Sequence, residues 1–406
     1  MLRCGLLGKK LGHSYSPAIH AMLGEYRYDL FEKTEDELPD FLKNGDWDGL
    51  NVTIPYKKTV VPCCAELSAT AKKTGSVNTL VRRPDGTLFG DNTDAPGFAA
   101  LVRKSRIAVE NKKVLVLGSG GAHSAVCAAL TEMKANPVVI SRSGENNYEN
   151  LSRQEDAAVV VNTTPVGMYP DNLKAPLDLR VFPALEAVID IIYNPALTGL
   201  LLQAEELGVR YANGLYMLAA QAKISSERFT GEAIDDRITD KITERLSSSM
   251  KNLVLIGMPG SGKTTIASAL AEKTGRPVFD SDEEIVKKAG MSIPEIFSKD
   301  GEGRFRELES EVLAELGKAS GTIISTGGGC VTRERNYPLL HQNGTILWIQ
   351  RAIGDLPREG RPLSAGDLQK MYELRKPMYE RFSDFTVVND GSVECLVQRI
   401  DEMCGL

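Results

Sequence analysis

The sequence predicts an α/β protein in which helices cover parallel sheets. Short apolar runs typical of strands alternate with helical patterns along almost the whole chain, and this alternation favours parallel α/β architecture. Two of the runs, 114–117 and 253–256, lead directly into a glycine-rich turn and a helix. At roughly 150 residues per domain, a chain of 406 residues corresponds to two or three domains.

The composition excludes several classes of protein. Charged residues make up 25% and hydrophobic residues 42% of the chain, with 37 Gly and 19 Pro, which excludes collagen-like and low-complexity sequence. The net charge is −6 without a basic segment, so we expect no nucleic-acid partner. No stretch approaches the roughly 18 apolar residues of a membrane span, and the N-terminal apolar run is too short for a secretory signal. Seven irregularly spaced cysteines indicate reduced thiols, so we expect a cytoplasmic protein with small-molecule substrates and no membrane partner.

The first glycine-rich turn, 118–122 (Gly-Ser-Gly-Gly-Ala), opens a helix that extends toward Met133. Gly118 permits a tight turn, and Gly120 lets the backbone approach a pyrophosphate at the helix N-terminus. A full GxGxxG pattern is absent because His123 takes the sixth place. The turn therefore predicts a dinucleotide site of the Rossmann type, with a merely tight strand–helix turn as the alternative.

The end of the next strand-like run, 137–140, indicates which dinucleotide is bound. Sites for NAD place a carboxylate about 20 residues after the glycines, whereas this chain has Ser141-Arg142-Ser143 there. A guanidinium suits a 2′-phosphate, so NADP is favoured over NAD. The alternative is that Arg142 is a solvated surface residue.

Four short polar motifs precede this turn. Residues 13–17 (His-Ser-Tyr-Ser-Pro) place two hydroxyls at a helix start, with Ser16 as the expected N-cap and the proline at the first helical position. For these hydroxyls, simple capping and the binding of a carboxylate both remain open. Residues 51–57 set Asn, Thr and Lys at alternate spacing at the end of an apolar strand, where a lone Lys is normally solvated. Amide, hydroxyl and carboxylate groups follow at 75–80 and 90–94.

Taken in order, these motifs resemble shikimate dehydrogenase. The HSxSP, NVTxPxK, VNT and GDNTD patterns occur with the family's spacing, and 213–221 continues a similarity that spans about residues 1–247. The resemblance implies that Ser14 and Ser16 bind the substrate carboxylate. It implies that the ring hydroxyls and carboxylate are held by Thr53, Asn78, Asp94, Tyr193 and Gln221. It implies, together with the turn, a cofactor site of Gly118, Gly120, Gly121, Ala122, Ser141, Arg142, Thr163, Gly214 and Met217.

Lys57 and Asp94 are the catalytic pair that the resemblance implies. A hydride that reaches a ketone carbon leaves an alkoxide, which needs a nearby proton donor. A lysine beside a carboxylate in a partly closed cleft can supply that proton or stabilise the charge.

One departure from the family concerns the cofactor domain: only 15 residues, 144–158, separate two of its strands. A parallel crossover usually takes more, so we expect this domain to lack a strand or helix, with altered binding at the adenine end.

The second glycine-rich turn, 257–264, matches GxxxxGK[ST] between a strand-like run and a helical pattern. In this pattern backbone N–H groups cradle phosphates, Lys263 reaches the β- and γ-oxygens, and Thr264 ligates Mg²⁺. The expected nucleotide contacts are Gly257, Gly260, Ser261, Gly262, Lys263, Thr264 and Thr265.

Later motifs in this part resemble shikimate kinase over residues 251–406. They are two carboxylates that share one side if extended (279–282), an FR pair in a charged helical run (303–307), a GGG turn (325–329), RPL (361–363) and RxPxY (375–379). The resemblance implies that Asp280 assists Mg²⁺ and that Asp282 orients or deprotonates the acceptor hydroxyl. It implies a carboxylate clamp of Arg306 and Arg375 with the backbone of Gly327, Gly328 and Gly329, a lid residue Arg361 near the transferred phosphoryl group, and an adenine-side Arg358 in a shortened 350–360 segment.

The two resemblances together predict a bifunctional enzyme. NADPH would reduce 3-dehydroshikimate to shikimate, and ATP would then phosphorylate the 3-hydroxyl. One alternative is a dehydrogenase that uses quinate and NAD, and another is that one half of the chain only binds ligand. A further hypothesis is direct transfer of shikimate from the first site to the second; its alternative is two enzymes that act independently. A small polar stretch, 246–251, predicts a boundary after a helix that begins near Ala233. The expected domains are 1–95 with 210–247 (substrate), 96–209 (trimmed Rossmann domain for NADP) and 251–406 (P-loop kinase with a parallel sheet).

Overall fold

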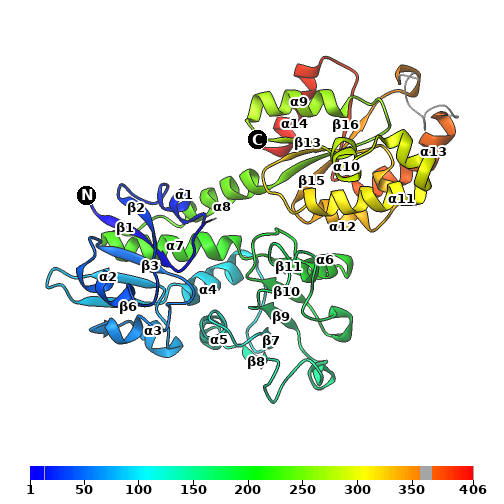
Figure 1. Ribbon diagram of the computed structural model, residues 1–406. Coiled ribbons are helices and arrows are strands. Elements are labelled where there is room, and N and C mark those ends of the chain that lie inside the picture. The colour runs from blue at the N-terminus through cyan, green and yellow to red at the C-terminus, as the bar shows by residue number, and fades with distance from the viewer. Residues whose placement is uncertain (13, 357–367, 406) are drawn as a thin grey trace. The chain divides into compact units, whose positions relative to one another are not determined.

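The computed structural model describes residues 1–12, 14–356 and 368–405, and internal contacts divide the chain into two units (Figure 1). The first unit comprises Met1–Gly167, Lys174–Tyr193 and Gly199–Arg245. The second comprises Leu246–Leu406 with two short segments, Met168–Leu173 and Asn194–Thr198.

The first sheet of the first unit has six strands in the order β2-β1-β3-β5-β6-β4. It is mixed, because β5 runs antiparallel to both β3 and β6. The turn between β5 and β6 explains this direction: Asp85 Oδ1 accepts hydrogen bonds from the backbone N–H and hydroxyl of Thr87, and Gly86 has φ +83°, which closes a hairpin. The strands are β1 (Arg3–Gly8), β2 (Arg27–Glu32), β3 (Gly49–Val52), β4 (Glu66–Leu67), β5 (Thr79–Arg82) and β6 (Leu88–Asp91). The helices of this part are α1 (Ser16–His20), α2 (Leu38–Asn44), α3 (Ala69–Thr74), α4 (Asp94–Lys104) and α7 (Leu215–Thr230).

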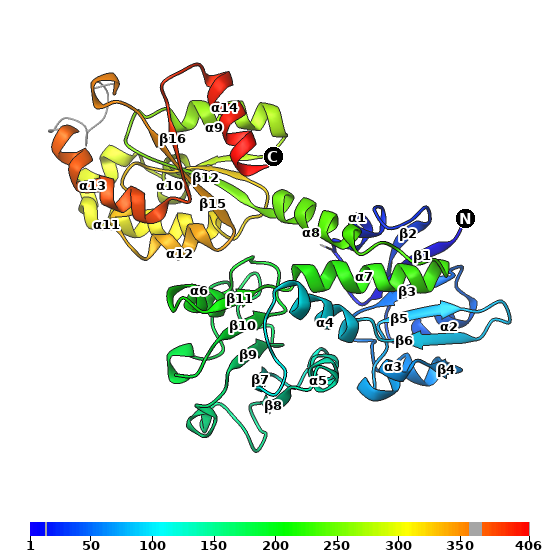
Figure 2. The same ribbon diagram turned by 180° about the vertical axis from the view of Figure 1, so that it is seen from behind.

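The second sheet of this unit has five parallel strands in the order β11-β10-β9-β7-β8 (Figure 2). Its strands are β7 (Lys113–Leu117), β8 (Asn136–Ile140), β9 (Val159–Asn162), β10 (Ala187–Asp190) and β11 (Arg210–Ala212), with helices α5 (His123–Glu132) and α6 (Gly199–Glu206). The connection from β8 to β9 contains only a 3₁₀ helix, Leu151–Gln154. The expected shortening of this crossover is confirmed.

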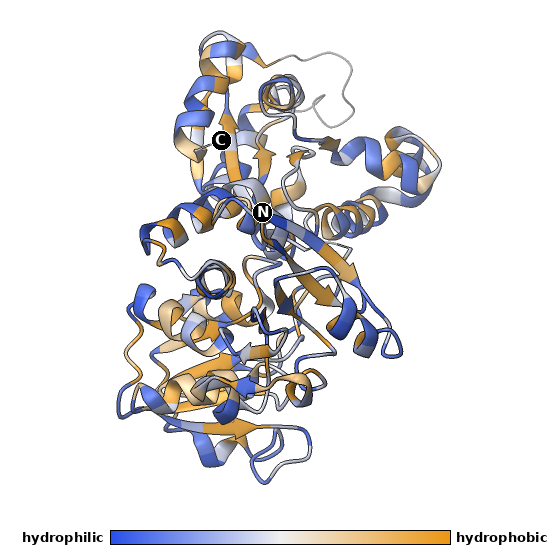
Figure 3. Cartoon of the chain, turned by 90° about the vertical axis from the view of Figure 1, so that its left-hand side faces the viewer, coloured by the Kyte–Doolittle hydropathy of each residue, from blue (hydrophilic) through white to orange (hydrophobic). Residues whose placement is uncertain are grey.

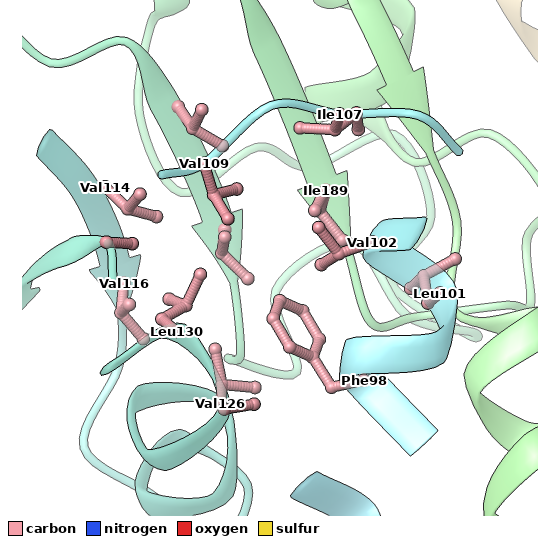
Figure 4. Packing of buried hydrophobic residues seen from close by; sticks show 14 of the residues in the cluster. Phe98, Leu101, Val102, Ile107, Val109, Val114, Val116, Val126, Leu130 and Ile189 are labelled. Atoms are coloured by element: carbon pink, nitrogen blue, oxygen red, sulfur yellow. The ribbon is translucent and has the colours of Figure 1, made fainter. Parts of the chain in front are cut away.

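The core of this second sheet joins it to α4 and α5. Figure 4 shows Phe98 of α4 beside Val126 and Leu130 of α5, all within one cluster of buried apolar side chains that includes Val116 and Ile189 from the strands. Strands that are buried on both faces need continuous apolar runs, which explains the sequence pattern at 114–117.

The second unit is built on a parallel sheet in the order β13-β14-β12-β15-β16. Apolar strands lie inside each unit, and helices present hydrophilic outer faces (Figure 3). The strands are β12 (Asn252–Ile256), β13 (Val278–Asp280), β14 (Ile323–Ser325), β15 (Gly344–Gln350) and β16 (Phe385–Val388). The helices are α9 (Lys263–Thr274), α10 (Ser281–Ala289), α11 (Ile293–Leu316), α12 (Asn336–His341), α13 (Leu368–Phe382) and α14 (Val393–Cys404).

The predicted boundary stretch is helical. Helix α8 (Arg237–Met250) starts later than Ala233 and runs through the serines, and the contact division falls between Arg245 and Leu246. Leu246 and Met250 are buried one helical turn apart, and this apolar spacing outweighs the polar composition that suggested a linker. The three-domain limits stay a prediction.

None of the helices in the described ranges is long and apolar enough to span a membrane. All seven cysteines are free thiols.

Phe98→Ala is expected to lower the free energy of unfolding by about 3–5 kcal/mol, because it leaves a cavity in a close-packed core. Phe98 is 0% exposed, whereas Leu207, at 43% exposed, serves as a control. Urea denaturation followed by circular dichroism measures both variants. Equal midpoints for Phe98→Ala and Leu207→Ala would contradict the packing assigned here.

Candidate active sites

A polar cavity of about 250 Å³ lies in the first unit. Side chains from β3, α1, α4, α7 and the segments between strands line it together with a few apolar groups. The structure brings together in this one cavity all the residues predicted for substrate binding and catalysis in this unit: Ser14, Ser16, Thr53, Lys57, Asn78, Asp94, Tyr193 and Gln221. The roles of the individual residues stay predictions.

An ion pair forms the centre of this cavity. Lys57 Nζ lies 2.6 Å from Asp94 Oδ2, with the two side chains 21% and 11% exposed. Asp94 is the first residue of α4, where the helix dipole favours a negative charge. Asn78 Nδ2 donates to the other carboxylate oxygen at 2.9 Å. The carboxylate is therefore fixed from two sides, and it holds the lysine in place.

Asn78 is itself held in one orientation. Its Oδ1 accepts a hydrogen bond from the backbone N–H of Thr93 at 2.7 Å, which turns its amide nitrogen toward Asp94. Thr53 follows the end of β3, and its backbone N–H donates to Leu7 O at 2.9 Å. The GDNTD and NVT motifs thus meet because β3, β5 and β6 are neighbours in one sheet.

The expected N-cap at Ser16 is wrong. Helix α1 begins at Ser16 itself, and Tyr15 occupies the cap position without a side-chain hydrogen bond. Ser14 Oγ accepts instead from the backbone N–H of Ser16 at 3.2 Å. The proline after Ser16 therefore falls in the second helical position, and the Ser16 hydroxyl is not used for capping. His13, the first residue of this motif, lies outside the described residues.

Tyr193 is one of the residues that line the cavity. Its ring meets that of Tyr15 edge to face at 6.1 Å. Burial raises the pKa of Tyr193, and the nearby Tyr15 adds to the effect. The Tyr193 hydroxyl stays protonated over the working pH range and can donate a hydrogen bond.

The dinucleotide turn has the backbone that its glycines predict. Gly118 has φ +99°, and a Cβ there would lie 2.7 Å from Thr164 Cγ2. Nothing lies within 4 Å of the Cβ positions of Gly120 and Gly121, so the turn in front of α5 leaves space for a pyrophosphate. These residues fit a dinucleotide.

The other predicted cofactor residues fall into two groups. Ala122, Gly214 and Met217 line the polar cavity described above. The dinucleotide turn and the predicted substrate residues therefore border the same cavity. Thr163 is not in the cavity lining; its hydroxyl donates to Leu117 O at 2.7 Å and holds the neighbouring strand end. The second group is Ser141 and the exposed Arg142, which come directly after β8.

The second unit places its phosphate loop between β12 and α9. Gly257, Gly260 and Gly262 have φ values of +145°, +85° and +98°, which L-residues with side chains rarely adopt. Lys263 Nζ donates to the carbonyls of Gly257 at 2.9 Å and Met258 at 3.0 Å. Ser261 is buried and Thr265 is exposed on the first turn of α9.

Thr264 and Asp280 lie together, as the metal prediction requires. The Thr264 hydroxyl donates to Asp280 Oδ2 at 3.2 Å, and Ser325 Oγ donates to the same oxygen at 3.0 Å. No cluster of three His, Cys, Asp or Glu that could hold a metal occurs in the described part of the chain. A hydroxyl and one carboxylate suit Mg²⁺, which keeps waters and phosphate oxygens as its other ligands.

Asp280 and Asp282 are not both in an extended segment, so the condition for sharing one side is not met. Helix α10 begins at Ser281, Asp280 is its N-cap, and Asp280 Oδ1 accepts from the backbone N–H of Asp282 at 3.0 Å. Asp282 therefore belongs to the first turn of α10. A Cβ at Gly327 would lie 2.7 Å from Asp282 Oδ1, so Asp282 lies against the glycine turn.

Each glycine of this turn faces a different group of the site. Besides Asp282 at Gly327, Pro259 of the phosphate loop lies 2.6 Å from the Cβ position of Gly328. Arg306 Nη1 and Nη2 both lie 2.4 Å from the Cβ position of Gly329. A Cβ at any of the three glycines would therefore force a neighbour to shift: the carboxylate, the phosphate-loop proline or the arginine.

The two predicted carboxylate-binding arginines converge on this turn. Arg375 Nη1 donates to Gly328 O at 3.1 Å, and Arg306 Nη1 donates to Glu309 Oε2 at 2.9 Å. Burial opposes the charge of Arg306, but Glu309 and Glu302 outweigh it and raise its pKa. Burial also opposes the charge of Glu309 and raises its pKa, while the nearby charge of Arg306 lowers it.

Sequence reasoning missed several residues of the two sites. Asn51 lines the first cavity although it was noted only as part of a motif. Glu309 stands three residues after Arg306, a helical spacing that could have indicated the pair. Asn389, after β16, donates from Nδ2 to Ser261 O in the phosphate loop at 2.7 Å; its partner is far away in sequence, so no local signal indicates it. Arg358 and Arg361 lie outside the described residues.

The fold and the two sites define a two-part α/β enzyme that combines a dinucleotide-dependent oxidoreductase with a P-loop kinase. Residues 6–80 match the family model of the shikimate dehydrogenase substrate binding domain, and residues 259–404 match that of shikimate kinase. The chain belongs to the shikimate dehydrogenase family and carries a shikimate kinase domain in its C-terminal part.

Relatives and solved structures cover the first part of the chain. The NADP⁺ shikimate dehydrogenase of Clostridium perfringens is 33% identical over an alignment of 264 residues that covers 60% of this chain and 97% of that protein. The Carboxydothermus hydrogenoformans enzyme is 35% identical over an alignment of 255 residues that covers 56% of this chain and 91% of that protein. A chorismate mutase/shikimate 5-dehydrogenase fusion protein from Clostridium acetobutylicum has a TM-score of 0.58 at 39% identity, covering 61% of this chain and 97% of that one. Shikimate 5-dehydrogenase from Thermus thermophilus in complex with NADP(H) and shikimate has a TM-score of 0.56 at 32% identity, covering 60% and 99%.

Gly329→Ala is expected to raise the KM for shikimate of the kinase reaction roughly tenfold, because a methyl group there displaces the buried Arg306 from its contacts. The KM for ATP should change little. Gly303→Ala, on α11 with nothing within 4 Å of its Cβ position, is the matched control. Steady-state kinetics with each substrate varied measures both values. Equal KM values for shikimate in the two variants would contradict the close approach.

Proposed function

We propose that this chain catalyses two consecutive reactions: the reduction of 3-dehydroshikimate to shikimate with NADPH, and the transfer of a phosphoryl group from ATP to the 3-hydroxyl of shikimate. The observation that carries the first reaction is the Lys57–Asp94 ion pair in a cavity with every predicted substrate residue. The second rests on the phosphate loop, Asp282 and two arginines around one glycine turn. We place both reactions in the cytoplasm, which the seven free thiols support.

In the first reaction the chain binds the acid and delivers a proton. NADPH supplies the hydride when bound. Lys57 donates a proton to the oxygen of the reduced carbonyl, and Asp94 holds the lysine in place before that step. Since the Lys57 side chain is 21% exposed, it can regain its proton from solvent. Ser14 and Ser16 hold the carboxylate of the substrate away from the catalytic lysine.

In the second reaction the chain positions two substrates and balances charge. Lys263 and the N–H groups of the loop hold the phosphates of ATP, while Thr264 and Asp280 would hold Mg²⁺, which neutralises phosphate charge. Asp282 orients the acceptor hydroxyl and takes its proton, while Arg306 and Arg375 bind the carboxylate of shikimate. Phosphoryl transfer depends mainly on such positioning and electrostatic stabilisation.

Separate lysine variants test the two activities. Lys57→Ala should abolish formation of shikimate, because the proton donor is lost, and leave phosphorylation of added shikimate intact. Lys263→Ala should stop phosphorylation and leave the reduction intact. Mass spectrometry of shikimate and shikimate 3-phosphate, made from 3-dehydroshikimate, NADPH, ATP and Mg²⁺, measures each product.

The exposed neighbour Lys58 and the surface Lys273 of α9 provide matched controls, and their alanine variants should make both products. If the unaltered chain made only one product, the other half would be a ligand-binding module. If it oxidised quinate with NAD in preference to shikimate with NADP, the alternative substrate would be correct.

Arg142→Ala is expected to raise the KM for NADPH roughly tenfold and to change the KM for NADH little, because a guanidinium pairs with the 2′-phosphate that only NADPH carries. Initial rates with each dinucleotide measure the ratio. Arg153, exposed in the same segment, gives the control variant Arg153→Ala. An equal loss with both dinucleotides would mean that Arg142 does not read the 2′-phosphate.

A further inference from the structure

A buried hydroxyl on α7 touches several groups of the dehydrogenase cavity without lining it. Ser225 is 0% exposed. Its Oγ lies 2.8 Å from Asn51 Nδ2, 2.8 Å from Thr79 Oγ1 and 3.0 Å from Thr93 Oγ1. It also donates to the carbonyl of Gln221, one helical turn earlier, at 2.9 Å. One side chain thus joins α7 to β3, β5 and the start of α4.

The hydrogen bond to the Gln221 carbonyl determines whether Ser225 donates to its other partners or accepts from them. A carbonyl oxygen can only accept, so the single hydrogen of the Ser225 hydroxyl is directed to it. The lone pairs of Ser225 are then left for Asn51 Nδ2 and one of the two threonine hydroxyls. As a result the amide nitrogen of Asn51 faces Ser225, and its Oδ1 accepts from the Tyr28 hydroxyl at 2.8 Å.

The same hydroxyl is connected to the catalytic pair through Thr93. Asn78 Nδ2 donates to Thr93 Oγ1 at 3.0 Å and to Asp94 Oδ1 at 2.9 Å. With Thr93 as the threonine that donates to Ser225, a continuous chain of hydrogen bonds runs from Ser225 through Thr93 and Asn78 to Asp94, which pairs with Lys57. Buried networks of this kind fix side-chain orientation when every member has a partner.

We propose that Ser225 is a positioning residue of the dehydrogenase site, which sets the orientation of Asn51 and of the Asn78–Asp94 pair toward the bound acid. It acts on binding of the hydroxy acid and not on the dinucleotide, because its partners Asn51 and Gln221 line the cavity and Thr93 bonds to Asn78, which also lines it. This inference rests on the proposed dehydrogenase function.

The adjacent serine provides a matched control. Ser226 is also 0% exposed on the same helix, and its Oγ accepts from the Tyr26 hydroxyl at 2.8 Å. That hydroxyl contacts His20 Nδ1 at 2.6 Å. Neither Tyr26 nor His20 lines the cavity, although His20 in turn contacts Asn51. Loss of the Ser226 hydroxyl therefore removes a buried hydrogen bond of the same kind two side chains further from Asn51 than Ser225.

The experiment compares Ser225→Ala and Ser226→Ala in the full chain, with shikimate oxidation by NADP⁺ as the readout. Ser225→Ala should raise the KM for shikimate roughly tenfold, the usual effect of a lost buried hydrogen bond on an equilibrium, and leave the KM for NADP⁺ unchanged. Ser226→Ala should leave both KM values unchanged. Ser225→Cys, which keeps the volume and a weak acceptor, should give an intermediate KM for shikimate. Thermal unfolding of both alanine variants measures the structural cost that they share.

The outcomes separate the inference from the function on which it rests. If the unaltered chain does not oxidise shikimate, the proposed dehydrogenase function fails and the inference fails with it. If the unaltered chain is active but Ser225→Ala matches Ser226→Ala in its KM for shikimate, the function stands and the positioning role is overturned. An equal rise of both KM values in Ser225→Ala would show a general structural effect and would also overturn it.

Discussion

A charge that is removed from water must keep a partner of opposite sign, and both sites are built around this constraint. In the first unit Lys57 and Asp94 form a pair whose side chains are mostly buried. In the second, Arg306 and Glu309 are paired with side chains 6% and 0% exposed. Breaking a buried pair by removing one partner is destabilising by about 3–5 kcal/mol. The carboxylates therefore fix the cations in position, so that less side-chain freedom is lost when a substrate acid is bound.

The parallel sheets bring the remaining groups together. In the second unit β12 lies between β14 and β15, so the phosphate loop after β12 and the glycine turn after β14 leave the sheet at the same edge. Asp280 ends β13, the next strand outward. In the first unit the turn after β7 and Thr163 after β9 share an edge in the same way. Ligand sites of open α/β sheets lie at the carboxyl ends of strands, and here that rule places residues far apart in sequence within hydrogen-bonding distance.

Motifs with a local physical cause could be predicted from the sequence, whereas partners across the fold could not. The glycines of 257–264 require unusual φ values wherever they occur, and the motif was sufficient to predict the loop. The pattern at Asp280–Glu284 contains a cap residue and an acidic first turn, which are typical of a helix start. Ser225 shows the limit, because its bond to Asn51 joins positions 174 residues apart. Nothing in the sequence around either residue indicates the other.

The shortened crossover after β8 shows how a missing helix changes the electrostatics of a site. In place of a helix, amide side chains hold the segment: the Asn147 N–H donates to Asn150 Oδ1 at 3.0 Å, and Asn150 Nδ2 donates to Glu145 O at 2.8 Å. Such bonds satisfy the backbone of a loop, but they add no aligned peptide dipoles. Under the proposed role of Arg142, attraction of the 2′-phosphate beside β8 therefore depends on the charge of that arginine. Because that arginine is exposed, its attraction is screened by salt, and discrimination between the two dinucleotides should weaken as ionic strength rises.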